Sequence, residues 1–120
     1  MGPFPHDAPK STISTDNPAG TDGFEFVEFA HPEPEKLRET FARMGYTHTA
    51  THKTKDIELW QQGDITYMLN NEQGSHAQAF VAEHGPCAPA MGWRVVDADH
   101  AFKHAVAKGA TPYELSLIHI

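Results

Sequence analysis

The chain has 120 residues, 39% of them hydrophobic, and a formal net charge of −7. That length allows one domain. The acidic balance, with nine scattered Lys and Arg, argues against nucleic acid or an anionic membrane surface as a partner, because both attract clustered basic residues.

The sequence also argues against secretion and against an internal disulfide. No apolar run approaches the roughly 20 residues of a membrane span, and the N-terminus lacks the basic and apolar regions of a secretion signal. Cys87 is the single cysteine, so no internal disulfide can form, and a small half-buried side chain is a better interpretation than a catalytic thiol. We therefore expect a soluble, cytoplasmic protein.

The chain opens with a polar segment and then a strand. Residues 1–22 are mainly Pro, Gly, Ser, Thr and Asp, which predicts a disordered lead-in. Phe24–Ala30 (FEFVEFA) is dense in aromatic residues at period-2 spacing, which predicts a strand. Residues 31–34 (HPEP) then end the strand and lead into a helix, since Pro is tolerated in a first helical turn.

A helix is predicted over residues 35–44. Leu37, Phe41 and Met44 recur at i, i+4 and i+7 and form one apolar stripe. Gly45 follows as the expected C-terminal cap.

Three strands and a second helix are predicted next. Residues 46–53 alternate and are rich in Thr, and residues 57–60 (IELW) follow after a polar turn. Gly63-Asp64 is typical of a hairpin turn that leads into residues 65–69 (ITYML). The order is therefore βαβββ, an α+β module, and a short helix over residues 75–84 follows it.

Part of this module then starts again. Residues 92–111 repeat the strand, helix and Gly, with Asp97 as N-cap, and Gly109 is the counterpart of Gly45 at an offset of 109 − 45 = 64 residues. The stripe expected to be buried in the second helix consists of Ala98, Ala101, Phe102, Ala105 and Val106. A module begun twice and completed once indicates a pseudo-symmetric architecture and a fragment of a longer protein.

Histidine pairs are the only candidates for a metal site. His48 and His52 are four apart on a predicted strand and share a face, but the Thr-rich surroundings favour a solvated surface. His100 and His104 have the i, i+4 spacing that can bind zinc on a helix, but they lie opposite the predicted apolar stripe, so we expect them to face solvent. We predict no metal-binding residue in this chain.

Other candidate groups also lack a catalytic arrangement. Glu25 and Glu28 have opposite parity on their strand and cannot form a carboxylate pair on one face. Trp60 and Trp93 are expected to be core residues rather than cofactor-stacking residues. We therefore predict neither a catalytic nor a cofactor-binding residue.

Three segments in this order, GTDGFEFVEF, KDIELWQQGDITYMLN and HGPCAPAMGWRVVDADHAF, resemble the N-terminal domain of bacterial 4-hydroxyphenylpyruvate dioxygenases. The resemblance runs from about Asn17 to Glu114. The family belongs to the vicinal oxygen chelate superfamily, whose βαβββ modules pair into cupped sheets. That agrees with the module order and the repeat found independently in the residues.

The resemblance implies a parent enzyme with Fe(II), held by two histidines and a glutamate of the C-terminal domain. That enzyme converts 4-hydroxyphenylpyruvate and O2 to homogentisate and CO2 in tyrosine catabolism. Its N-terminal domain has lost metal binding and serves structure and assembly. Glu25 stands about where a metal-binding module would offer its histidine, so the chain alone is expected to be inactive.

The resemblance and the repeat divide the chain into five parts. These are a lead-in (1–22), a first module (23–74), a connecting helix and loop (75–87), a truncated second module (88–114) and residues 115–120 (LSLIHI), which resemble a translated sequencing adapter. The alternative for the last part is a genuine final strand. Without its sheet, the second module would expose apolar surface, so we expect marginal stability and self-association.

Two alternatives remain open at this stage. A hydroxymandelate synthase uses the same substrate and iron, and the residues that separate it from a dioxygenase lie outside this chain. A small stand-alone protein of the same superfamily would instead pair its modules between two chains and bind a small ligand as a dimer. The expected partners of a dioxygenase fragment are its missing C-terminal catalytic domain and further copies of the parent.

Overall fold

The computed structural model describes residues 9–112. Within them the elements are β1 (Thr21–Ala30), α1 (Pro34–Arg43), β2 (Thr47–Thr51), β3 (Ile57–Gln62), β4 (Ile65–Asn70), α2 (His76–His84), β5 (Cys87–Val95) and α3 (Ala98–Ala107). The first five give the βαβββ order, so the predicted α+β module is confirmed. The described residues form two compact units, one of Phe24–Gly92 and the other of Pro9–Gly23 with residues 93–112.

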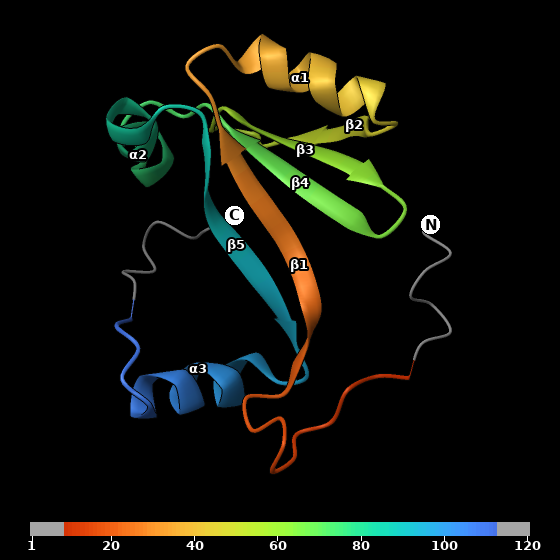
Figure 1. Cartoon of the computed structure of the whole chain (residues 1–120), viewed down its shortest axis with the longest axis vertical. Coiled ribbons are helices and arrows are strands. Elements are labelled where there is room, and N and C mark those ends of the chain that lie inside the picture. The colour runs from red at the N-terminus through yellow and green to blue at the C-terminus, as the bar shows by residue number, and fades with distance from the viewer. Residues whose placement is uncertain (1–8, 113–120) are drawn as a thin grey trace. The chain divides into compact units, whose positions relative to one another are not determined.

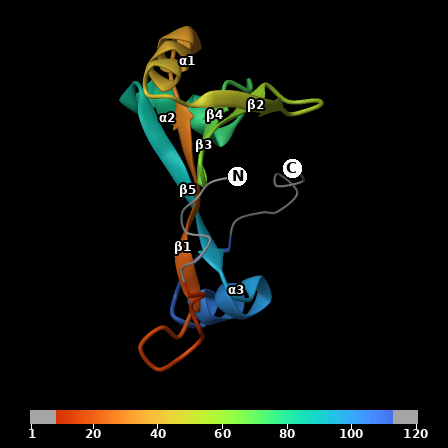
Figure 2. The same ribbon diagram turned by 90° about the vertical axis from the view of Figure 1, so that its right-hand side faces the viewer.

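The sheet has the strand order β2-β3-β4-β1-β5. In the first unit β2, β3 and β4 lie side by side in both views (Figure 1, Figure 2), and they pair antiparallel. Gly63 has a φ of +58° at the hairpin between β3 and β4, the positive value that the first loop position of a II′ turn needs. Return of the chain through the hairpin brings β4 parallel to β1, with Val27 opposite Tyr67.

Aromatic side chains form the core between α1 and the sheet. Phe41 of α1 is 2% exposed, and its ring centroid lies 5.4 Å from Phe29, 5.8 Å from Trp60 and 5.2 Å from Tyr67. Such pairs add about 0.5–1.5 kcal/mol each to the burial of apolar area. The predicted stripe is therefore confirmed at Phe41, but it is wrong at Met44, which is the C-cap residue and 49% exposed.

One ion pair also joins α1 to the sheet. The guanidinium of Arg38 binds both oxygens of Glu58 on β3: Nε donates to each at 3.0 Å and Nη2 to Oε2 at 2.6 Å. Trp60 Nε1 donates to the same carboxylate at 3.0 Å. Burial alone would raise the pKa of Glu58, but these hydrogen bonds outweigh it, and the pKa is below its usual value.

The second unit contains α3, which repeats the helix end of the first module. Asp97 caps the start of α3 by accepting a hydrogen bond from the His100 amide, as predicted. At the other end Ala110 N donates to the Ala105 carbonyl oxygen at 3.0 Å, and in the first module Tyr46 N donates to the Phe41 carbonyl oxygen at 2.9 Å. The offset is again 110 − 46 = 64 residues, and Gly45 and Gly109 have φ values of +95° and +108°. The helix end of the predicted repeat is therefore confirmed.

Three predictions for this unit are wrong. The apolar stripe of α3 is not buried: the helix has no buried residue, and Phe102 and Val106 are 48% and 37% exposed. The opposite side of the helix carries His100 and His104, which were expected to face solvent, and both are half-buried. Trp93 was expected in the core with Trp60, but it is 55% exposed, whereas Trp60 is 8% exposed.

The described part of the expected lead-in also has a defined course. Asn17 accepts hydrogen bonds from the Thr21 amide and hydroxyl and donates one to the Thr21 carbonyl oxygen. These bonds close a turn before β1, which begins at Thr21 rather than at Phe24. The adapter-like residues 115–120 lie outside the described residues. No helix within residues 9–112 has the length and apolar character to cross a membrane.

We predict that Arg38→Met lowers the free energy of unfolding by roughly 1–3 kcal/mol at pH 7, because it leaves the Glu58 carboxylate buried without its main partner. This loss is smaller than that expected for a fully buried ion pair, because Arg38 is partly exposed. The loss of stability should shrink as the pH falls below the usual carboxyl pKa. Glu58 is then progressively protonated, so the ion pair stabilises the natural chain less. Urea unfolding at pH 7 and pH 3.5 measures both effects. The matched control, Arg38→Met with Glu58→Met, should recover most of the stability, and a double variant no better than the single one would contradict this account.

Candidate functional site

The strand register gives the sheet of the first unit two different faces. Trp60 and Tyr67 are cross-strand partners, and both pack against Phe41 of α1. The next residues along, Leu59 and Met68, are also partners and point to the opposite face. We call this opposite face the second face.

Glu28 is the acidic residue of β1 on the second face. It is the partner of Met68 in the parallel register, and its Oε2 accepts a hydrogen bond of 3.3 Å from Asn70 Nδ2. Burial raises the pKa of Glu28, and the hydrogen bond from Asn70 and the charge of His76 offset this only in part. Glu25 is exposed and has the opposite parity, so the prediction that the two glutamates do not share a face is confirmed.

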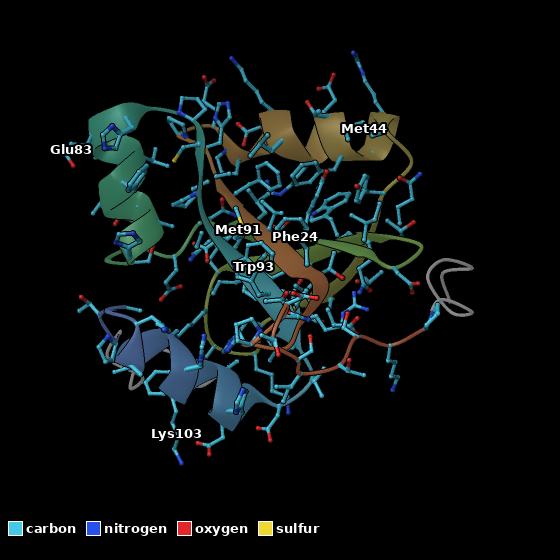
Figure 3. The ribbon with its side chains drawn as sticks, turned by 60° about the horizontal axis from the view of Figure 1, so that its bottom comes forward. Phe24, Met44, Glu83, Met91, Trp93 and Lys103 are labelled. Carbon is cyan, nitrogen blue, oxygen red and sulfur yellow. The ribbon has the colours of Figure 1, made fainter. Side chains whose placement is uncertain are left out.

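Three further side chains of the first unit lie on β1 and β5: Cys87, Phe24 and Met91. Cys87 is half-buried, and burial, followed by the negative charge of Glu28, raises the pKa of its thiol. This is the opposite of what a nucleophilic thiolate requires. Phe24 on β1 and Met91 on β5, both labelled in Figure 3, are 53% and 52% exposed. Cys87 is therefore not an activated nucleophile.

Neither histidine pair forms a chelate. A register shift between His48 and Ala50 breaks the strand alternation, and His52 lies past the end of β2. His48 Nε2 lies 2.9 Å from Thr51 Oγ1, and its ring stacks on Trp60 at 5.1 Å. His52 Nδ1 accepts hydrogen bonds from the backbone amides of Thr54 and Lys55 at 3.1 Å each. The predicted solvated surface is confirmed for β2, whose five residues are all exposed, but the shared face is not formed.

The histidine pair of α3, His100 and His104, does not face solvent as predicted. The His100 and His104 rings stack with centroids 6.2 Å apart, and His100 Nε2 donates to the Pro18 carbonyl oxygen at 2.8 Å. The expectation that both face solvent is wrong, because each is half-buried. Sequence reasoning missed the contact with Pro18 because 82 residues separate the two partners.

Residues 15–118 match the family model described as "Hydroxyphenylpyruvate dioxygenase, HPPD, N-terminal". The chain is 47% identical over 100 residues to a 4-hydroxyphenylpyruvate dioxygenase of Pseudomonas sp. (strain P.J. 874), which covers 83% of this chain. It is 42% identical over 102 residues to the same enzyme of Legionella pneumophila (strain Corby), which covers 85%. The chain belongs to the 4-hydroxyphenylpyruvate dioxygenase family.

The matches with dioxygenases involve only part of each relative. The chain spans 28% of the Pseudomonas protein and 29% of the Legionella protein. It is also 39% identical over 94 residues to a 3-dehydroshikimate dehydratase of Pseudomonas aeruginosa, covering 77% of this chain and 15% of the relative. The 4-hydroxyphenylpyruvate dioxygenase unit thus occurs in relatives of different overall size.

Solved structures agree with the fold. A xylose isomerase-like TIM barrel/4-hydroxyphenylpyruvate dioxygenase fusion protein matches with a TM-score of 0.74 and 34% identity, covering 88% of this chain and 16% of that chain. Methylmalonyl-CoA epimerase from Mycobacterium tuberculosis matches with a TM-score of 0.65 at 18% identity, covering 86% of this chain and 73% of that chain. The second likeness supports the vicinal oxygen chelate fold alone.

The donor groups among residues 9–112 do not fit the metal site that a dioxygenase family implies. In the part of the chain that the structure describes, no three His, Cys, Asp or Glu side chains come close enough to hold a metal ion. Glu28 has an amide, Asn70, as its hydrogen-bond partner instead of a second ligand.

We predict that Glu28→Gln raises the free energy of unfolding by roughly 0.5–1 kcal/mol at pH 7.5, because it removes a half-buried charge while leaving an oxygen for Asn70. A group whose pKa is raised on folding adds stability below its unfolded value and loses it as the pH rises through the folded value. The gain should therefore shrink toward pH 4. Urea unfolding at the two pH values measures it. Glu25→Gln on the same strand is the matched control, and an equal effect of both substitutions at pH 7.5 would contradict this interpretation.

Proposed function

We propose that this chain is the non-catalytic N-terminal piece of an Fe(II)-dependent 4-hydroxyphenylpyruvate dioxygenase. The parent would convert 4-hydroxyphenylpyruvate and O2 to homogentisate and CO2 in tyrosine catabolism. The observation that carries the proposal is 47% identity to a dioxygenase of which the chain spans only 28%. The iron ligands, two histidines and a glutamate, would come from the C-terminal catalytic domain of the parent.

In that parent the role of these residues is structural. The sheet and α1 form a packed unit around Phe41, whereas Trp93, Phe102 and Val106 keep large exposed surfaces. We propose that the missing part of the protein covers these three side chains, and that the parent is a cytoplasmic homo-oligomer without nucleic acid or membrane partners. The domain division 1–22, 23–74, 75–87, 88–114 and 115–120 remains part of this proposal.

Three alternatives remain. A hydroxymandelate synthase would share this part of the protein, and a stand-alone dimeric binding protein would need no further domain. A dehydratase fusion is a third possibility, but the identity to that relative is 39% against 47% for the dioxygenase. The dioxygenase is therefore favoured.

We predict that residues 1–114 can replace the matching segment of the Pseudomonas sp. enzyme. The chimera, supplied with Fe(II) and 4-hydroxyphenylpyruvate, should consume O2 within roughly tenfold of the natural enzyme, because the catalytic residues stay in place and only their support changes. The 120-residue chain alone should consume none. An oxygen electrode with product analysis by chromatography gives the rate and distinguishes homogentisate from hydroxymandelate.

The control for this experiment is the same enzyme with the segment deleted, which should be inactive or unfolded. Oxygen consumption by the chain alone would contradict the proposal. A folded but inactive chimera would also contradict it and would favour the dimeric binding protein.

We further predict that the purified chain self-associates and melts at low temperature, because large apolar side chains such as Trp93 and Phe102 are about half exposed. Light scattering coupled to gel filtration should give a mass above the 13.3 kDa of one chain, increasing with concentration. Trp93→Gln with Phe102→Gln should lower the apparent mass. A monodisperse monomer with a cooperative, high-temperature melt would contradict this prediction.

A further inference from the structure

A pocket with both polar and apolar lining residues lies at one edge of the first unit. Its volume is about 280 Å³, and it is bounded by the ends of β1 and β4, the start of α1 and part of α2. Because β1 and β4 are parallel, their carboxyl ends meet at the same edge of the sheet. The polar side chains of the lining are His31, Asp56, Asn70, Asn71, Gln73 and Gln78.

Asn71 has an unused carboxamide in this pocket. Its backbone amide donates to the Asp56 carbonyl oxygen at 2.8 Å, which fixes the residue at the end of β4. Both Nδ2 and Oδ1 are shielded from solvent and have no hydrogen-bond partner among the described residues. A buried donor and acceptor left unmet destabilise the folded state, so such a group calls for an explanation.

The neighbouring carboxamides are already engaged. Asn70 donates to Glu28 and accepts from the Glu72 amide at 3.0 Å. Gln78 donates to Gln73 and accepts from the Gly74 amide. Asn70 and Gln78 are therefore held in place by hydrogen bonds, whereas both polar atoms of the Asn71 side chain remain unmet.

The charges of the lining disfavour an anionic ligand, because no Lys or Arg lines the pocket among residues 9–112 and Asp56 would repel an anion. A cation alone could not accept from Asn71 Nδ2, whereas a neutral group with both a donor and an acceptor could satisfy both atoms of the carboxamide. His31 Nδ1 accepts a hydrogen bond from the Glu33 amide at 2.9 Å, so in the neutral ring the proton lies on Nε2, which can only donate.

We propose that this pocket binds a small neutral molecule with a hydrogen-bond donor and acceptor on adjacent atoms, a carboxamide or lactam, through the side chain of Asn71. The terminal torsion of Asn has a broad energy well, so the carboxamide can turn from its shielded position toward the pocket. The ligand would satisfy both unmet atoms at once. The proposal is independent of the dioxygenase assignment and concerns a site without catalytic groups.

The test uses the ¹⁵N-labelled 120-residue chain and 2-pyrrolidinone as the probe. We expect a saturable shift of the Asn71 side-chain NH2 signals, with a Kd on the order of 1–10 mM for a ligand of this size. Asn71→Leu should weaken binding at least tenfold. It should leave the melting temperature of the unliganded chain unchanged or higher, because it removes two unmet polar atoms. Glu25→Gln, an exposed position outside the pocket lining, should keep the Kd within about twofold.

Three results would overturn the proposal. One is the lack of a saturable shift at ten times the expected Kd. Another is an Asn71→Leu variant that binds the probe as the natural chain does. The third is a clear fall in melting temperature for Asn71→Leu, because it would mean that the Asn71 carboxamide has a structural partner and is not available to a ligand.

Discussion

The contact of Phe41 with the sheet is the interaction on which the first unit depends. This one side chain of α1 lies 5.2–5.8 Å, centroid to centroid, from aromatic rings on β1, β3 and β4, so it joins three strands at once. The ion pair of Arg38 with Glu58, one helical turn before Phe41, fixes the same helix against β3. Hydrophobic burial supplies most of the stability here, and the ion pair restricts how the helix can lie.

The second copy of the motif repeats the helix end but lacks this core. At the offset of 64 residues the counterpart of Phe41 is Ala105, and that of Phe29 is Trp93, which is 55% exposed. The helix end is reproduced bond for bond, since Lys108 N donates to the His104 carbonyl oxygen as Met44 N does to Thr40. Local hydrogen bonds thus define α3, while the packing that would bury it depends on residues outside this chain in the proposed parent.

Sequence patterns predicted the features that depend on neighbours in the chain. Period-2 spacing identified β1, the i, i+4 spacing of Leu37 and Phe41 identified α1, and the cap at Asp97 is where the pattern places it. The patterns failed where burial is decided by distant contacts. An apolar stripe on α3 predicts a buried face only if a sheet lies against it, and the bulge at His48 and the Asn71 carboxamide leave no periodic signal. The iron chemistry was accessible only through the family resemblance.

Native-state hydrogen exchange tests most directly the central claim, that a complete first module is joined to a second one whose packing partner is missing. In the chain alone, amides of α1, β3 and β4 should exchange slowest, and those of α3 should exchange at rates close to local fraying, because α3 has no buried residue. In the chimera with the dioxygenase, the α3 amides should become as protected as those of α1. Equal protection of α1 and α3 in the isolated chain would contradict the account.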